Sequence, residues 1–122
     1  MDIRAAGLLG RARELVLVGW CQQMDARALD GAEVQPWDER AVAWSLLGSL
    51  VAALEEEADH GRELPLQHLA AALDALADFI DDDSLAAWND ASVRTQDEVA
   101  AALAAAIATA SRRADGSTET HD

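Results

Sequence analysis

The sequence predicts an all-α fold: a small single-domain helical bundle of four main helices plus one short helix. Its hydrophobic share of 51% is largely Ala and Leu, and only 7 Gly and 2 Pro occur in 122 residues. Apolar residues also recur at the three- and four-residue spacing of a helix, without a strand signal. We therefore expect residues 1–110 to form the bundle and residues 111–122 to form a flexible polar tail.

The first predicted helix covers residues 2–23. One face of it collects small and apolar residues at helical spacing, namely Leu8, Ala12, Leu15, Val16 and Gly19. Residues 24–37 contain Asp30-Gly31 and Pro36, and this composition predicts a long loop.

Asp38 is the predicted N-cap of the second helix, with Glu39 in its first turn. Its apolar side holds Ala43, Leu47, Leu50 and Leu54. Gly48 in the middle of this helix costs about 1 kcal/mol relative to Ala, so we expect another helix to approach closely there.

The third predicted helix has Pro65 in its first turn. Its apolar stripe is the clearest in the chain and contains Leu66, Leu69, Leu73, Leu76 and Ile80, while Asp74, Asp78 and Asp81 share the opposite face. A short helix over residues 85–89 follows, with Ser84 as its cap. Thr95 and Glu98 then form a capping box for the last helix, whose apolar residues are Val99, Leu103 and Ile107.

Charge and composition exclude several classes of function. The chain has 23 acidic against 9 basic residues, a net charge of −14, which disfavours direct nucleic-acid binding. No apolar stretch reaches the roughly 20 residues of a membrane helix, and no signal peptide is evident, so we expect a cytoplasmic protein. The single cysteine excludes an intrachain disulfide. The histidines lack metal-ligand spacing, and we expect neither a metal nor a cofactor.

Four tryptophans are unusual in a chain that is otherwise aliphatic. Trp20 and Trp44 stand beside the polar residues Cys21, Gln22 and Ser45, which suggests an aromatic-lined pocket for a small polar or aromatic ligand. In the alternative, the rings fill core gaps left by alanines, and each indole N–H finds a local partner.

Asn89, Asp90, Arg94 and Thr95 form a polar turn between two predicted helices. In one interpretation it is a structural latch, in which Asn89 and Asp90 bond neighbouring backbone amides and Arg94 pairs with Asp90 or another acid. In the other, these side chains face a pocket beside Trp20 and Trp44. The candidate ligand-binding residues are Trp20, Cys21, Gln22, Trp44, Ser45, Trp88, Asn89, Asp90 and Arg94.

Four segments carry a family resemblance: Gly19-Trp20-Cys21-Gln22, residues 41–48 (AVAWSLLG), residues 85–91 (LAAWNDA) and residues 94–99 (RTQDEV). Together they resemble DUF6197, an uncharacterised family of small bacterial and phage proteins. Ser45 stands where that family usually has cysteine, so a cysteine-dependent role at this position is not expected here. The resemblance implies no established activity.

The sequence contains residues that suit two kinds of chemistry, thiol catalysis and the carrier-protein serine motif. Cys21, His60 or His68, and Asn89 supply the residue types of a thiol nucleophile, its base and an orienting amide, although buried packing explains a lone cysteine equally simply. Asp83-Ser84-Leu85 is similar to the modified serine motif of acyl carrier proteins. The acidic helix end at residues 54–57, however, precedes this serine instead of following it.

The expected function is therefore that of a small acidic binding protein whose acidic side, centred on the helix that bears Asp74, Asp78 and Asp81, meets a basic protein surface. The alternative is a small biosynthetic or hydrolytic enzyme that uses the same pocket, or an acyl-carrier-like protein. Alanine-rich helices such as the last one can also pair between subunits, so a homodimer is compatible with the sequence.

Overall fold

The computed structural model describes residues 3–59, 66–80 and 84–119. Within these ranges the chain forms five helices and a three-stranded antiparallel sheet, so the prediction of an all-α fold is wrong. In chain order the elements are α1 (Ile3–Val18), β1 (Ala26–Ala28), β2 (Glu33–Val34), β3 (Ala41–Trp44), α2 (Leu46–Asp59), α3 (Leu66–Ala77), α4 (Leu85–Asp90) and α5 (Gln96–Glu119).

The sheet occupies the predicted loop and the start of the predicted second helix. Its strand order is β2-β1-β3, and Arg27 of β1 lies opposite Glu33 on one side and Ala43 on the other. Gly31, with a φ of 91°, makes the turn between β1 and β2 and donates its N–H to the Ala28 carbonyl at 2.9 Å. The strands have only two to four residues, too few for an alternating pattern to be recognised in the sequence.

Helix α2 begins later than predicted. Ser45, not Asp38, is its cap: the buried Ser45 hydroxyl accepts the N–H of Gly48 at 3.0 Å. Asp38 instead accepts the N–H of Arg40 at 2.8 Å in the turn before β3. Gly48 does have a close neighbour, as expected, but the neighbour is the backbone of Asp25 and not another helix.

Helix α1 ends at Val18, before the predicted limit. Gly19 still donates to the Leu15 carbonyl at 3.1 Å, but its own carbonyl accepts the N–H of Trp44 at 3.0 Å. A Cβ atom on Gly19 would overlap the carbonyl oxygen of Val42. Glycine therefore suits the position where the chain leaves the helix, because β3 passes too close there for a side chain.

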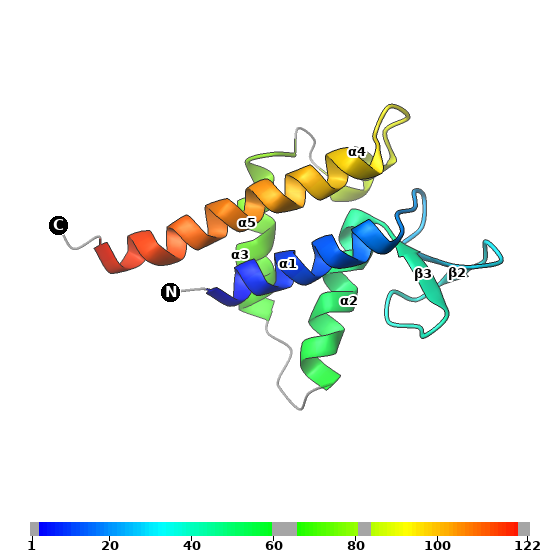
Figure 1. Ribbon diagram of the computed structural model, residues 1–122, viewed down its shortest axis with the longest axis horizontal. Coiled ribbons are helices and arrows are strands. Elements are labelled where there is room, and N and C mark those ends of the chain that lie inside the picture. The colour runs from blue at the N-terminus through cyan, green and yellow to red at the C-terminus, as the bar shows by residue number, and fades with distance from the viewer. Residues whose placement is uncertain (1–2, 60–65, 81–83, 120–122) are drawn as a thin grey trace.

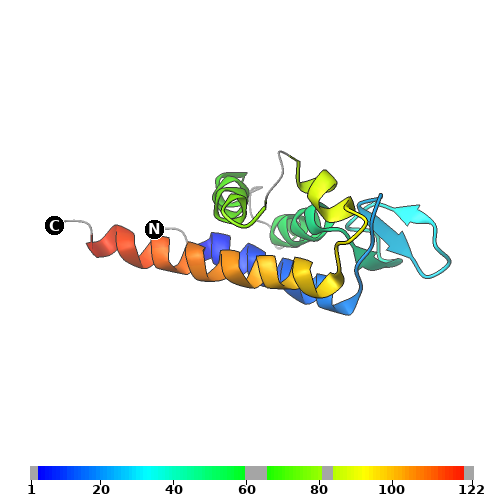
Figure 2. The ribbon, with the colours of Figure 1, turned by 90° about the horizontal axis from the view of Figure 1, so that it is seen from above.

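The core lies between the helices. Helix α1 packs along α5 and against α2 and α3, while the sheet projects at one end, away from the beginning of α1 and the end of α5 (Figures 1 and 2). Leu8, Ala12, Leu15 and Val16 of the predicted α1 stripe are buried, which confirms it. The largest fully buried apolar side chains are Leu9, Leu46, Leu50, Leu76, Leu103, Val16 and Val99.

Both predicted caps in the second half of the chain are confirmed. The Ser84 hydroxyl accepts the Ala87 N–H at 3.2 Å. Thr95 and Glu98 form the reciprocal capping box, with the Thr95 hydroxyl accepting at 3.2 Å and the Glu98 carboxylate at 3.0 Å. Helix α5 continues to Glu119, beyond the predicted end at Ala110. Whether residues 111–122 are flexible stays a prediction.

Of the predicted stripe, Leu76 is buried and Leu69 and Leu73 pack partly buried against the core, whereas Leu66 is exposed at the start of α3. Ile80 also packs against the core but lies beyond the end of the helix at Ala77. Asp74 and Asp78 face solvent as predicted, but Arg113 of α5 bonds both carboxylates, at 3.0 and 3.1 Å. The negative charge on the face of α3 that holds Asp74 and Asp78 is therefore partly neutralised. Pro65 and Asp81 lie outside the described residues.

Candidate functional site

Asn89 is the centre of a hydrogen-bonded network that joins three parts of the chain. Its side chain is 1% exposed. Its Oδ1 accepts the indole N–H of Trp20 at 2.8 Å and the backbone N–H of Leu46 at 3.0 Å. Its Nδ2 donates to the Cys21 carbonyl and to Oδ1 of Asp90, both at 3.1 Å. The buried amide thus uses all of its donors and acceptors inside the protein.

Two neighbouring glutamines complete this network. Nε2 of Gln22 donates to the carbonyls of Asn89 and Ala91 at 2.9 and 3.0 Å. The backbone N–H of Gln23 donates to Oδ1 of Asp90 at 2.7 Å, in a residue with a φ of 67° that non-glycine residues rarely adopt. We call Trp20, Gln22, Gln23, Asn89 and Asp90 the latch. Asn89 and Asp90 do bond backbone amides, but these are the amides of Leu46 and Gln23, distant in the sequence, and not the neighbouring amides that the structural interpretation expects. A ligand role for Asn89 and Asp90 stays a prediction.

The candidate tryptophans have separate partners. Trp20 donates to Asn89, whereas the buried Trp44 donates its indole N–H to the Pro36 carbonyl at 2.9 Å. Trp88 is buried in the main core, and the guanidinium of Arg94 lies 3.8 Å from the centroid of its ring. The contacts of Trp20 and Trp44 match the alternative in which the rings pack into the core and the indole N–H has a partner inside the protein.

Of the two predicted kinds of partner for Arg94, Asp90 or another acid, the structure shows another acid, Glu98. The Nε of Arg94 donates to the Trp88 carbonyl at 2.9 Å near the end of α4, and its Nη1 lies 3.7 Å from the Glu98 carboxylate. A guanidinium at a helix C-terminus satisfies a carbonyl that has no partner in the helix, which is the physical reason for this placement.

The thiol of Cys21 is buried and donates to the Met24 carbonyl at 3.7 Å. Burial raises its pKa from 9.0 to about 11; Arg27 opposes this shift, and the carboxylates of Asp25, Asp90 and Glu33 add to it. A thiol with this pKa is protonated at neutral pH and is a weak nucleophile.

Among the described residues, the thiol and the amide of the predicted catalytic set have other partners. Asn89 bonds the carbonyl of Cys21 and not a histidine ring, and the Cys21 thiol bonds a backbone carbonyl. His68 lies on α3, which packs against α1 and α5. His60 and His121, like Asp83 of the carrier-type motif, lie outside the described residues.

A cleft opens beside the latch. It has a volume of about 280 Å³, and of the described residues that line it three carry carboxylates and none is basic. We call it the acidic cleft; its lining residues are Gln23, Met24, Asp25, Glu33, Ser45, Leu47, Ala86, Asn89 and Asp90. Ser45, Asn89 and Asp90 of the candidate set therefore meet at one cavity.

Two of these carboxylates, those of Asp25 and Glu33, were not among the site residues predicted from the sequence. Both lie in the segment predicted as a loop, and only the sheet brings them beside Asp90. Asp25 is further fixed because its carbonyl accepts the N–H of Ser45 at 3.0 Å. An excess of acids near the Asp30-Gly31 turn was visible in the sequence, but their convergence was not.

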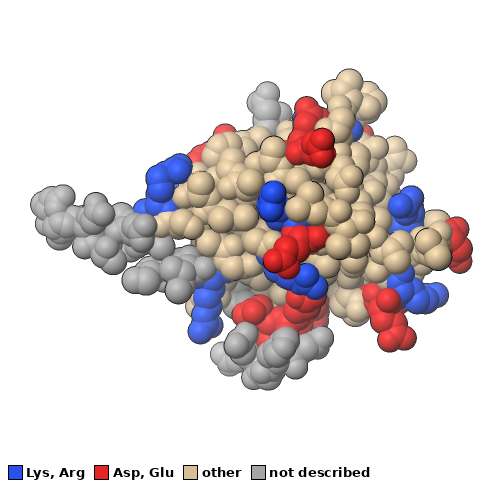
Figure 3. Space-filling model, in the orientation of Figure 1, with Lys and Arg blue, Asp and Glu red and all other residues tan. Residues whose placement is uncertain are grey.

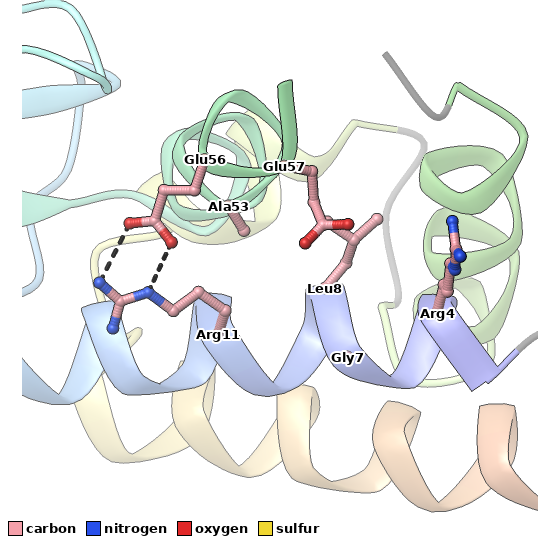
Figure 4. Close-up of a pocket in the computed structure, with 7 residues that line it drawn as sticks. All are labelled: Arg4, Gly7, Leu8, Arg11, Ala53, Glu56 and Glu57. Carbon is pink, nitrogen blue, oxygen red and sulfur yellow. Dashed lines mark hydrogen bonds and ion pairs between the residues drawn. The ribbon is translucent and has the colours of Figure 1, made fainter. Parts of the chain in front are cut away.

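A second cavity, of about 310 Å³, lies between α1 and α2 (Figure 4). Arg11 forms a two-pronged ion pair with Glu56 there, at 2.8 and 3.0 Å, and Glu57 and Arg4 lie farther along the same groove. Two arginines and two glutamates line it, so its charge is balanced, unlike that of the acidic cleft.

In residues 3–59, 66–80 and 84–119, no group of three His, Cys, Asp or Glu side chains is placed to hold a metal ion. No helix in these ranges has the length and apolar character needed to cross a membrane.

The chain matches the model of DUF6197, described as a family of unknown function, over residues 1–109. This confirms the resemblance seen in the sequence. Comparisons with curated proteins and with solved structures gave no match.

Proposed function

Because the chain belongs to DUF6197, a family without an assigned activity, we propose a function from its own site: it is a small acidic interaction protein that binds a basic segment of a protein partner in the acidic cleft. The observation that carries this proposal is a cavity lined by Asp25, Glu33 and Asp90 and by no basic residue.

The electrostatics of the cleft favour a cation. Arg27 lies opposite Glu33 in the sheet but is not among the lining residues, so three negative charges share the cavity without a lining counter-charge. The same carboxylates raise the pKa of the Cys21 thiol, which supports a negative potential at this place. A lysine or arginine side chain supplies the missing positive charge.

The size and construction of the cleft suit a side chain of a partner. Its volume of about 280 Å³ lies just below the 300–1,000 Å³ of pockets for drug-sized ligands. The latch fixes Asp90 and Gln23 on one wall, through the 2.7 Å bond between them. A preformed wall lowers the ordering cost of binding.

No specific observation favours the enzyme alternative. The thiol of Cys21 is buried with a pKa of about 11, so it does not supply a thiolate at neutral pH. We further infer a cytoplasmic location, which the single cysteine supports because disulfides are typical of exported proteins.

The test is a titration of the protein with a synthetic decapeptide of alternating arginine and glycine, measured by calorimetry. We expect the double variant Asp25→Asn/Glu33→Gln to bind about 3- to 30-fold more weakly than the wild type. The matched control is Asp97→Asn/Asp74→Asn, which removes the same charge from exposed helix positions away from the cleft.

The control separates the cleft from general charge attraction. A loss of affinity confined to the cleft variant supports the proposal. Equal losses in the two double variants, or no loss in either, would show that the cleft is not the binding site.

A further inference from the structure

Trp37 is held rigidly at the surface beside the sheet. Its side chain is 54% exposed, and the N–H of Asp38 donates to the Gln35 carbonyl at 3.0 Å, closing a turn with Pro36 in its second position. The indole N–H of Trp44 ties the Pro36 carbonyl to the core at 2.9 Å. A large aromatic surface is therefore presented to solvent by a fixed turn.

Trp37 lines a groove of about 250 Å³ whose other lining residues include apolar side chains, four carboxylates and one arginine. Buried Leu15, Pro36, Trp44 and Ala52 contribute its apolar part. We call this cavity the Trp37 groove; it is completed by Arg11, Asp38, Glu39, Ala41, Glu55 and Glu56. Figure 3 shows acidic side chains gathered on the part of this face where α2 lies.

Most charges of the groove are already paired. Arg11 is bonded by Glu56 and Glu14, which raises the pKa of its guanidinium above the ordinary value. Asp38 is bonded by Arg40 at 3.0 Å, which lowers the pKa of that carboxyl.

Two carboxylates of the groove, those of Glu39 and Glu55, have no ion pair among the described residues. With one arginine and four carboxylates lining the groove, its net charge is −3. The groove therefore combines an exposed indole, an apolar part and unpaired negative charge.

We propose that the Trp37 groove binds an arginine side chain of the basic partner, with the guanidinium stacked on the Trp37 indole and paired with Glu39 and Glu55. Indole is the best aromatic partner for a cation, and a planar guanidinium stacks and pairs with carboxylates at once, which an ammonium does not. The inference rests on the proposed function for the basic character of the partner, but it uses a different surface.

The groove and the acidic cleft lie on different parts of α2. Leu47 lines the cleft, whereas Ala52, Glu55 and Glu56 line the groove. The two cavities share no lining residue, so substitutions can probe them separately.

The experiment follows the indole N–H signals of the isotope-labelled full chain by NMR during titration with the blocked peptide acetyl-Gly-Arg-Gly-amide. The Trp37 signal is assigned from the spectrum of Trp37→Phe. We expect it to shift on titration, and Trp37→Leu to bind about 2- to 30-fold more weakly. The control Leu29→Ala removes another exposed apolar side chain from the sheet region. Helical circular dichroism confirms that each variant is folded.

A second pair of variants tests the role of the negative charge in the groove. Glu55→Gln weakens binding more than Asp97→Asn, and a lysine peptide binds more weakly than the arginine peptide. An unshifted Trp37 signal, or equal affinities of wild type and folded Trp37→Leu, would overturn the inference.

Titrations with acetyl-Gly-Arg-Gly-amide also separate this inference from the proposed function. If only Asp25→Asn/Glu33→Gln binds this peptide more weakly, the acidic cleft is retained as the binding site and the Trp37 groove is overturned. Weaker binding by Trp37→Leu alone retains the groove and overturns the cleft.

Discussion

At the scale of single residues, Asn89 links more of the molecule than any other polar side chain described above. It connects the segment after α1, the first turn of α2 and the end of α4 through contacts of its carboxamide. Buried polar networks of this kind stabilise only when every member is satisfied. Cys21, whose carbonyl belongs to the same network, adds a titratable group that burial keeps neutral.

We expect Asn89→Ala to lower the free energy of unfolding by about 2–4 kcal/mol, because the Trp20 indole N–H and the Leu46 N–H lose a buried acceptor. Urea unfolding followed by circular dichroism measures the change. The control Gln67→Ala alters an exposed position of α3 and should change stability by less than about 0.5 kcal/mol. Similar values for the two variants would contradict the central role of Asn89.

The pKa of Cys21 predicts how stability changes at alkaline pH. It is raised from 9.0 to about 11, so below pH 9 the thiol is protonated in both states and its full contribution is present. Between these values the unfolded chain releases the proton first, and up to about 2–3 kcal/mol of stability is lost as pH rises.

This prediction can be measured cleanly because the chain contains no Lys and no Tyr, whose side chains would titrate in the same range. Urea unfolding at pH 8 and at pH 11 gives the two free energies. Cys21→Ala should lack this loss. A wild-type curve that is as flat as that of the variant would show that the thiol pKa is not raised.

At the scale of elements, backbone approach decides where helices begin and end. α1 ends where Gly19 meets the carbonyl of Val42, and the first turn of α2 rests against the backbone of Asp25 through Gly48. These contacts attach the sheet to the helices, and both depend on the missing side chain of a glycine.

Gly48→Ala should therefore destabilise the protein by about 1–3 kcal/mol, although alanine is the better helix former. The added Cβ would overlap the Asp25 carbonyl. Gly10→Ala in α1 is the matched control: its Cβ meets no atom within 4 Å, so it should stabilise by about 0.5–1 kcal/mol. Thermal unfolding of both variants tests the pair, and a stabilised Gly48→Ala would disprove the close approach.

At the scale of the whole molecule, the net charge of −14 governs encounters with partners. Arg113 neutralises part of the acidic face on α3, whereas the acidic cleft and the Trp37 groove each keep a net charge of −3 among their lining residues. The uneven distribution favours binding at the end of the molecule that holds the sheet and α2. A homodimer and a bacterial or phage origin stay predictions.

Long-range attraction of this kind makes association depend on salt. We expect the association rate with the arginine–glycine decapeptide to fall at least about 10-fold between 20 and 500 mM NaCl, while dissociation changes less. Stopped-flow tryptophan fluorescence measures both rates. A rate of association that salt leaves unchanged would exclude electrostatic steering by this surface.

The sequence by itself determined the features that depend on near neighbours. The stripe of α1, the Ser84 cap and the Thr95–Glu98 capping box were all predicted, because helix periodicity and capping involve residues three or four positions apart. The family was also recognisable, since each of its four motif segments is a continuous run of residues in the chain.

Only the tertiary structure decided the sheet, the true start of α2 and the site. The pairing of Ala26 with Trp44, and the bond from Trp20 to Asn89, join residues that are distant in the sequence. The strands are too short to show a pattern, and the convergence of Asp25 and Glu33 on the cleft depends on those strands. In Ala41–Trp44 the two alanines favour a helix whereas Val42 and Trp44 suit a strand, and pairing with β1 decides between the two.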